Sequence, residues 1–324
     1  MNRDIINSTI LITGGAGFIG SNLVEKLLKE GTKEIIIIDN LFCGREDNLT
    51  FCLDKKKVFF YKDDAEIFSS LEYIFNKHNI DIVINCATKA LNYSFINPSN
   101  SFTVNTNIAI NLLELLRKNK YKTLCQFSTS EVYGTAVYEP MDEGHPKKPM
   151  TLYAAGKAAA DLAVETYVSM FNLDAFIFRP FNNYGPKQNY HGILSGVIPA
   201  TAYRIFKGEK PIIYGDGKQS RDFIFVDDTI DALIKLFPII GSGDTVNVST
   251  DNQTKIIDVV KKICEIMDCK YDIDYLPARS SDVQYHNADN SKIKSMINYN
   301  LTPFNDGMIH TINWYKNEFE RTNI

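Results

Sequence analysis

The chain has 324 residues, 44% of them hydrophobic and 23% charged, and its formal net charge is −4 at pH 7. This composition is that of an ordinary globular protein, long enough to bury a large core. It excludes a strongly basic surface for nucleic acid, and no apolar run approaches the ~18 residues that a membrane span needs. We therefore expect neither a nucleic-acid nor a membrane partner.

The cysteines and histidines do not indicate a metal site. Six cysteines are scattered without metal-ligand spacing, and the five histidines are dispersed. Several of the cysteines lie in apolar runs, as buried thiols do, and the N-terminus enters a strand without a signal-peptide core. These features predict a protein of the reducing cytoplasm that binds no metal.

A glycine-rich turn near the N-terminus predicts a dinucleotide-binding site. The apolar run Ile10–Ile12 is followed by Gly14, Gly17 and Gly20, and then by apolar residues at helical spacing. Glycines in such a turn permit the bend, let the backbone approach a pyrophosphate and let the helix pack on the strand. The N-terminus of the helix then offers free N–H groups to the phosphates.

The acid that ends the second predicted strand indicates which dinucleotide binds. Asp39 follows the apolar run Glu34–Ile38 and lies 19 residues beyond Gly20, where a carboxylate hydrogen bonds a ribose 2′-OH. Because this acid would repel a 2′-phosphate, NAD is favoured over NADP. Arg45 leaves NADP open, and the same residues would also fit a mononucleotide or flavin site, or an aspartate that only caps a turn.

Strand-like and helix-like segments alternate through the first half of the chain. This order predicts an α/β fold of the Rossmann type, with a doubly wound parallel sheet whose strand ends bind ligands. After the first two strands, the predicted strands are 58–61, 81–86, 123–128 and 175–179, and the predicted helices are 67–78, 106–118 and 153–170.

Glycine, proline and asparagine become frequent after Pro180, which is typical of loops and predicts a smaller C-terminal α/β lobe for the substrate. The strand 223–226 and the helix 228–236 are predicted to return to the main sheet. The expected division is an NAD-binding domain over 1–180, joined by about 223–245, and a substrate lobe over 181–222 and 246–324.

Tyr153 and Lys157 stand four residues apart in a predicted helix, so their side chains leave the same face. A neighbouring ammonium favours the ionised form of a phenol, whose ordinary pKa is about 10. The tyrosine could then act as a base near neutral pH. The spacing alone is also that of an ordinary surface pair, so the rest of the chain has to decide between the two.

Several motifs occur together in one order. They are TGGAGFIG, an Asp-Asn pair after the second strand, STSEVYG, YAAGK, RPFNNYGP and RDFIFVDD. With these motifs the chain resembles, over nearly its whole length, the extended short-chain dehydrogenase/reductase family, and within it the nucleotide-sugar epimerases and dehydratases. It is most similar to the NAD-dependent nucleotide-sugar 4,6-dehydratases.

The resemblance implies roles for the residues at matching positions. Thr129 would hydrogen bond the C4 hydroxyl of the sugar, Tyr153 would take its proton, and Lys157 would bind the nicotinamide ribose and lower the pKa of the tyrosine. The residues implied to hold NAD are Gly14, Gly17, Phe18, Ile19, Asp39, Asn40, Asp63 with its neighbour Asp64, Ala87, Tyr153 and Lys157.

The resemblance also implies a pocket for a nucleotide-diphosphate sugar. Asn182 would contact the diphosphate, Arg221 and Arg279 would lie near the nucleotide and its phosphates, and Val197 would line the base pocket. Structural ion pairs are the alternative for the two arginines. Lys89 stands where the family usually has a small residue, and it either reaches phosphate or substrate or lies on the surface.

Glu131 bears on which reaction the resemblance implies. Members of the family begin by moving hydride from sugar C4 to NAD, but a 4,6-dehydratase also needs a carboxylate that removes the C5 proton. Glu131 stands two residues past Thr129, where dehydratases of the family have that glutamate, and Ser130 stands where some have an aspartate as acid. The implied catalytic set is Thr129, Ser130, Glu131, Tyr153 and Lys157.

A nucleotide-sugar 4,6-dehydratase is thus the predicted activity, and three further readings of the same residues stay open. Glu131 could only order its loop, as in a 4-epimerase, which needs no base at C5. A UDP-glucuronate decarboxylase shares the Ser-Glu pair, and a non-catalytic NAD-binding sensor needs none of these groups. By the same resemblance, the helices 107–118 and 153–170 are expected to pair across a homodimer as a four-helix bundle.

Overall fold

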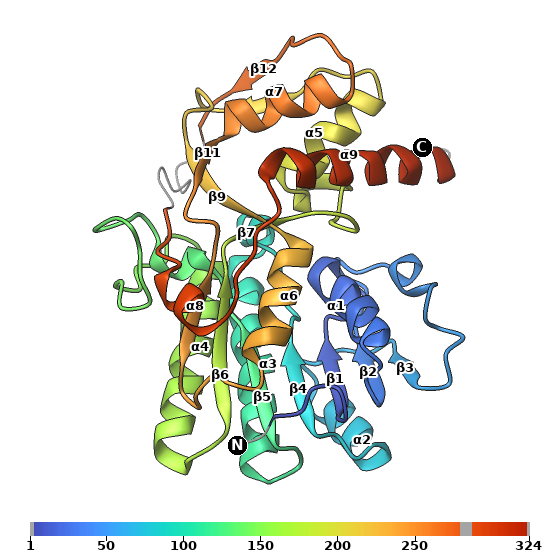
Figure 1. Ribbon diagram of the computed structural model, residues 1–324, viewed down its shortest axis with the longest axis vertical. Coiled ribbons are helices and arrows are strands. Elements are labelled where there is room, and N and C mark those ends of the chain that lie inside the picture. The colour runs from blue at the N-terminus through green and yellow to red at the C-terminus, as the bar shows by residue number, and fades with distance from the viewer. Residues whose placement is uncertain (1–2, 279–286, 323–324) are drawn as a thin grey trace.

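The computed structural model describes residues 3–278 and 287–322, and its larger part is a seven-stranded parallel sheet (Figure 1). The strands are β1 (Thr9–Thr13), β2 (Glu34–Ile38), β3 (Val58–Tyr61), β4 (Ile82–Asn85), β5 (Thr123–Phe127), β6 (Ala175–Pro180) and β10 (Thr245–Val248). Their spatial order is β10-β6-β5-β4-β1-β2-β3, so the winding reverses between β1 and β4. This confirms the Rossmann-type α/β prediction, and such a reversal is where ligands bind.

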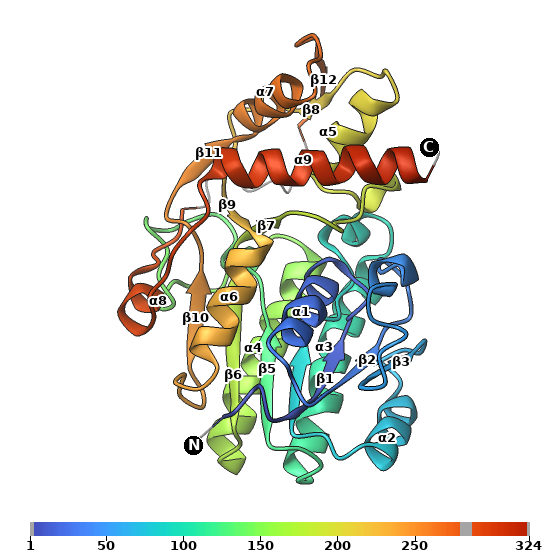
Figure 2. The same ribbon diagram turned by 45° about the vertical axis from the view of Figure 1, so that its right-hand side comes forward.

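Alternating apolar side chains explain why both faces of this sheet are covered. In β1, Ile10 and Ile12 point into one core cluster and Leu11 into the other, and all three are fully buried. Figure 2 shows α1 and α6 over one face of the sheet and α3 and α4 over the opposite face. The helices of this layer are α1 (Phe18–Lys29), α2 (Phe68–Lys77), α3 (Pro98–Arg117), α4 (Leu152–Phe171) and α6 (Val226–Leu236).

A smaller lobe covers the carboxyl ends of the main strands, as Figure 1 shows. Its own core is rich in aromatic rings, among them Tyr184, Tyr190, Tyr315 and Phe319. Its elements are β7 (Asn182–Tyr184), β9 (Ser220–Phe225) and β11 (Gln253–Lys255) in one sheet, β8 (Ile212–Tyr214) and β12 (Asp274–Leu276) in another, and the helices α5 (Val197–Phe206), α7 (Ile256–Ile266) and α9 (Phe304–Arg321). The short helix α8 (Ser291–Met296) packs beside β10.

The expected sheet membership of one strand is wrong. The strand predicted at 223–226 is β9, and it pairs with β7 and β11 in the lobe rather than with the main sheet. The main sheet is completed instead by β10, which pairs with β6, although all of β10 except its first residue falls within the segment assigned to the lobe. Both strands are short apolar runs, and long-range pairing, which periodicity does not encode, decides which sheet each joins. The division into two domains stays a prediction.

None of the helices within residues 3–278 and 287–322 is both long and apolar enough to cross a membrane.

Candidate active site

Two cavities meet at the carboxyl ends of the main strands. The first, of about 340 Å³, is lined by the glycine turn, by residues after β2 and β4, and by residues of the segment 188–196. The second, of about 690 Å³, extends from the strand ends into the lobe. Both sizes suit small-molecule sites. Thr129 and Tyr153 line both cavities, so they stand where a cofactor and a substrate would meet.

The glycine turn fits a pyrophosphate because its backbone is packed too closely for side chains. Gly14 has a φ of +69°, and a Cβ added there would lie 2.7 Å from the Cα of Ala87. The helix α1 begins directly after Gly17, so that Gly17, Phe18 and Ile19 line the first cavity at a helix N-terminus. This is the arrangement that binds phosphate groups through backbone N–H groups.

Asp39, which is predicted to bind a ribose, lines the first cavity. Its carboxylate is buried and accepts hydrogen bonds from the backbone N–H groups of Ala16, at 2.9 Å, and Leu41, at 2.8 Å. Burial raises the pKa of Asp39, and these amides oppose that rise. The other residues predicted to hold NAD beside it line the same cavity; they are Asn40, Asp63, Asp64 and Ala87. Asn40 Nδ2 donates a hydrogen bond to Asp64 Oδ2 at 2.6 Å.

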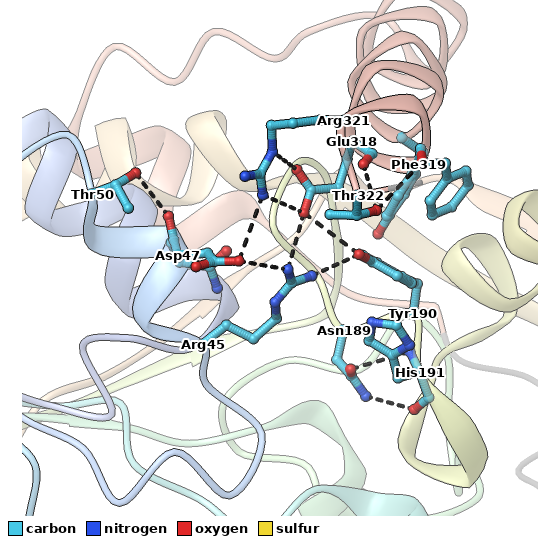
Figure 3. Close-up of polar contacts among 12 residues, drawn as sticks. Arg45, Asp47, Thr50, Asn189, Tyr190, His191, Glu318, Phe319, Arg321 and Thr322 are labelled. Atoms are coloured by element: carbon cyan, nitrogen blue, oxygen red, sulfur yellow. Dashed lines mark hydrogen bonds and ion pairs between the residues drawn. The ribbon is translucent and has the colours of Figure 1, made fainter. Parts of the chain in front are cut away.

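Arg45, which left NADP open, is engaged elsewhere (Figure 3). Its Nη1 donates to the hydroxyl of Tyr190 at 2.7 Å, and its Nη2 pairs with Asp47 at 3.0 Å and Glu318 at 3.2 Å. A guanidinium held by two carboxylates and a phenol is not placed to receive a 2′-phosphate. The position of Arg45 therefore supports NAD.

A short turn after β5 brings Glu131 to the second cavity. The chain forms a 3₁₀ helix over Ser130–Tyr133, capped by Thr129, whose hydroxyl accepts a hydrogen bond from Glu131 N at 3.3 Å. Glu131 is buried and lines the second cavity together with Tyr153. Ser130 is buried too, but it is not among the described residues that line either cavity. The structure thus brings Thr129, Glu131 and Tyr153 together at the second cavity, and Ser130 is not among its described lining residues.

The electrostatics of Tyr153 differ from the expectation. Burial raises the pKa of Tyr153 to about 12, the hydroxyl of Thr129 opposes the rise, and the carboxylate of Glu131 adds to it. Lys157, whose ammonium donates to the carbonyl of Phe127 at 2.7 Å, does not bring this pKa below its ordinary value. In the chain by itself, the pKa of Tyr153 is thus shifted upward, opposite to the direction expected from Lys157, and the effect of Lys157 stays a prediction. A positive charge bound beside the phenol, such as oxidised nicotinamide, would lower that pKa.

A buried ion pair that the motifs did not reveal lies next to Lys157. Asp161, one helical turn further along α4, pairs with Arg179 at 2.7 Å, and both side chains are fully buried. Ser128 Oγ donates to the same carboxylate oxygen at 2.7 Å. Burial lowers the pKa of Lys157 to about 8, and Asp161 opposes that fall. The repeat of Tyr153, Lys157 and Asp161 at intervals of four was a signal for a third polar residue on this face.

We expect Asp161→Ala to lower the free energy of unfolding by about 3–5 kcal/mol, because it leaves Arg179 as a buried charge without its carboxylate. Urea unfolding followed by circular dichroism measures the change. The matched control is Thr166→Ala, at an exposed position of the same helix, which should stay within about 0.5 kcal/mol of wild type. Equal free energies of unfolding for the two variants would show that removing the carboxylate of Asp161 does not destabilise the protein.

The depressed pKa of Lys157 predicts a stability that depends on pH. The pKa is about 8 in the folded chain against an ordinary 10.5, so between these values the unfolded chain binds more protons. Below about pH 8, Lys157 is charged in both states, and its burial lowers the free energy of unfolding by the full amount. As pH rises from about 8 to about 10.5, the folded chain loses this proton first, so the free energy of unfolding rises. Lys157→Met should gain stability over wild type at pH 7 and gain less at pH 9.5. Urea unfolding at both pH values checks this, and an equal gain would contradict it.

The residues predicted to hold substrate divide between the cavities. Asn182, Val197 and Arg221 line the second cavity, as expected for a nucleotide sugar. Lys89 lines the first cavity, and it is buried with its ammonium 3.4 Å from the centre of the Phe42 ring, so the surface alternative is wrong. Arg279 lies outside the described residues.

Comparison with known proteins agrees with this geometry. The family model for GDP-mannose 4,6 dehydratase matches residues 11–310. The UDP-glucuronate 4-epimerase of Thermodesulfobacterium geofontis is 34% identical over 326 residues, which cover 96% of this chain and 97% of that protein. Other relatives include a UDP-glucose 4-epimerase, a dTDP-D-glucose 4,6-dehydratase and a UDP-glucuronic acid decarboxylase.

Two solved structures share nearly the whole fold. The dTDP-glucose 4,6-dehydratase of Bacillus anthracis, in complex with NAD, has a TM-score of 0.88 and 28% identity, covering 97% of this chain and 98% of that one. The UDP-glucose 4-epimerase of Thermotoga maritima, with UDP-glucose, has a TM-score of 0.89 and 28% identity, covering 96% and 99%.

The family is NAD-dependent, and the Bacillus anthracis structure contains NAD. The first cavity has the glycine turn, helix N-terminus and ribose-side carboxylate that NAD requires. The extent of the family match and the cavity lining lead to the same conclusion. The chain belongs to the extended short-chain dehydrogenase/reductases described by the GDP-mannose 4,6-dehydratase model, a family of NAD-dependent nucleotide-sugar epimerases and dehydratases.

Proposed function

We propose that the protein is an NAD-dependent nucleotide-sugar 4,6-dehydratase. The observation that carries the proposal is the carboxylate of Glu131, buried on the second cavity beside Thr129 and Tyr153. Removal of a proton from C5 of the sugar needs a base beside that carbon, and a carboxylate can serve. A 4-epimerase has no use for such a group.

The proposed reaction assigns one step to each side chain. Tyr153 takes the proton of the C4 hydroxyl, which Thr129 holds by a hydrogen bond, and Lys157 orients the nicotinamide ribose. Bound NAD supplies the hydride acceptor at C4 and the hydride donor at C6, so it is not consumed. The C4 ketone makes the C5 proton acidic, and Glu131 removes that proton.

Departure of the C6 hydroxyl also needs a proton. Because Ser130 is a buried serine that is not among the described residues lining either cavity, we assign the acid to another group than the one at that position. Glu131, protonated by the C5 step, can pass the same proton to the leaving C6 oxygen, which departs as water. One carboxylate then acts first as base and then as acid. When hydride adds at C6, C5 takes a proton that comes from solvent, and Tyr153 releases the C4 hydroxyl proton to solvent, which balances the reaction.

A nucleotide-sugar 4-epimerase is the second candidate. It is favoured by the 34% identity to a UDP-glucuronate 4-epimerase and by the buried position of Ser130. In that case Glu131 would order its turn through the backbone, and Glu131→Gln would barely change turnover. A UDP-glucuronate decarboxylase is the third and less favoured possibility.

The proposed substrate is a nucleotide-diphosphate sugar in the second cavity. Arg221 and Asn182 would bind the diphosphate, and Val197 would pack against the base. The purified protein is to be mixed with UDP-, GDP- and dTDP-hexoses and the products identified. A 4-keto-6-deoxy sugar supports the dehydratase, whereas a C4-inverted sugar alone rejects it.

We also propose a homodimer formed by α3 and α4. These helices carry exposed apolar side chains, and the same helices of a second copy would cover them in a four-helix bundle. The exposed side chains are Ile110, Leu162, Met170 and Phe171. Light scattering is expected to give twice the mass of one chain.

A cytoplasmic location is supported by the six cysteines, all of which are free thiols.

A further inference from the structure

The backbone of Arg45 lies beside the glycine turn that lines the first cavity. Arg45 N donates to Ala16 O at 3.1 Å, which fixes it to the glycine turn. The preceding Gly44 lies against Asp39, because a Cβ added there would come 2.9 Å from both carboxylate oxygens. Any shift of Arg45 would therefore disturb the residues at the ribose end of the first cavity.

The side chain of Arg45 reaches across to the lobe (Figure 3). Besides its bond to the Tyr190 hydroxyl and its ion pair with Glu318, the guanidinium lies 5.3 Å from the centre of the Tyr190 ring. The Tyr190 hydroxyl in turn donates to Glu318 Oε1 at 3.5 Å. The three side chains thus close a triangle, and we name Arg45, Tyr190 and Glu318 the clasp.

Burial separates the clasp from the ion pairs around it. Within the clasp, the side chains of Arg45 and Glu318 are 25% and 10% exposed, and Tyr190 is 3% exposed. Asp47 and Arg321, which extend the network at the surface, are 52% and 57% exposed. Exposed ion pairs contribute little, whereas desolvated charges depend strongly on their partners. Removal of one partner is therefore expected to cost more within the clasp than in the surface ion pairs.

Tyr190 lies in a wall that the two cavities share. Its ring packs in the lobe core, with centroids 4.9 Å from Phe319 and 5.8 Å from Tyr203, and it lines the second cavity. Its neighbours Gln188 and Asn189 line the first cavity. The segment that the clasp holds is thus in contact with both ligand spaces.

We propose that the clasp couples the two cavities. By holding the segment 188–190 against the glycine turn, it keeps NAD in place, and a nucleoside diphosphate in the second cavity tightens that hold. Arg45 is then a positioning residue for the cofactor rather than a group that contacts the reacting atoms. The coupling part of the inference rests on the proposed binding of a nucleotide sugar, and retention of NAD suits a reaction that returns its hydride.

The test measures the rate at which NAD leaves the purified protein, with and without UDP, GDP or dTDP. In wild type a saturating nucleoside diphosphate should slow release on the order of tenfold, within the range of coupled sites. Arg45→Met and Glu318→Gln should each release NAD faster and lose most of that slowing. The double variant should be no worse than the worse single one, since both changes remove one interaction.

Glu320→Ala, at an exposed position of the same helix α9, is the matched control and should behave as wild type. The proposal would be overturned if the variants had the wild-type melting temperature, the wild-type rate of NAD release and the wild-type slowing of that release by a nucleoside diphosphate. Tyr190→Phe, which removes only a hydroxyl, replaces any variant that does not fold, and wild-type behaviour in it would overturn the proposal as well.

Failure of the proposed substrate class gives a different result. If no nucleoside diphosphate binds to the wild type, a nucleotide sugar is rejected as the substrate class. The rate of NAD release from the variants still tests whether the clasp holds NAD. Faster release in Arg45→Met and Glu318→Gln than in Glu320→Ala supports the clasp, and equal release overturns it.

Discussion

Tyr153→Phe is expected to lower kcat by about 10²- to 10⁴-fold, the range of a lost acid–base group. Phenylalanine keeps the ring that lines both cavities but has no oxygen to accept the proton of the C4 hydroxyl. Bound NAD and the melting temperature should stay close to wild type, because the ring still fills its place. Product formation under saturating substrate measures the change in kcat.

The matched control for this variant is Tyr73→Phe, at an exposed position of α2 that lines neither cavity. It should turn over as wild type does. A Tyr153→Phe protein that retains full NAD and works within a few-fold of wild type would show that the phenol is not the base.

Glu131→Gln should separate the two halves of the proposed reaction. Glutamine has nearly the same shape, but it cannot accept the C5 proton, so oxidation at C4 should proceed and elimination should stop. Reduced NAD should then accumulate on the protein, and turnover should fall by about 10²- to 10⁴-fold. Stopped-flow absorbance of the reduced nicotinamide, together with product analysis, measures both effects.

Glu139→Gln provides the control, since Glu139 is an exposed acid a short distance further along the chain. It should neither accumulate reduced NAD nor lose turnover. Near-normal turnover of Glu131→Gln, with a C4-inverted product, would identify the protein as an epimerase instead.

Local patterns in the sequence were sufficient to predict six of the seven strands of the main sheet, β1 to β6. Runs such as Glu34–Ile38 are apolar on both faces, and glycine spacing fixed the position of the first turn. The start of α3 was predicted too late, at 106 rather than Pro98. Asn97 caps this helix by accepting a hydrogen bond from Asn100 N at 3.1 Å, and the Asn-Pro pair was the available signal.

Features that depend on contacts between distant residues could not be predicted in this way. The sheet that β9 joins, the ion pair of Asp161 with Arg179 and the clasp all bring together segments from separate elements. The upward shift of the Tyr153 pKa in the chain by itself could not be predicted for a related reason. Helical spacing predicts which residues share a face. The burial of the phenol and the hydrogen bond from the Lys157 ammonium to the carbonyl of Phe127 depend on packing, which the spacing does not encode.

In the proposed reaction, the phenol of Tyr153 and the carboxylate of Glu131 act at adjacent carbons of one sugar ring. The most direct test of this claim is to run the reaction in heavy water with an accepted nucleotide hexose and to locate deuterium in the product by NMR. The proposed dehydration predicts deuterium at C5 of a 4-keto-6-deoxy product from wild type and no such product from Glu131→Gln. A C4-inverted sugar that carries no deuterium at C5 would contradict it.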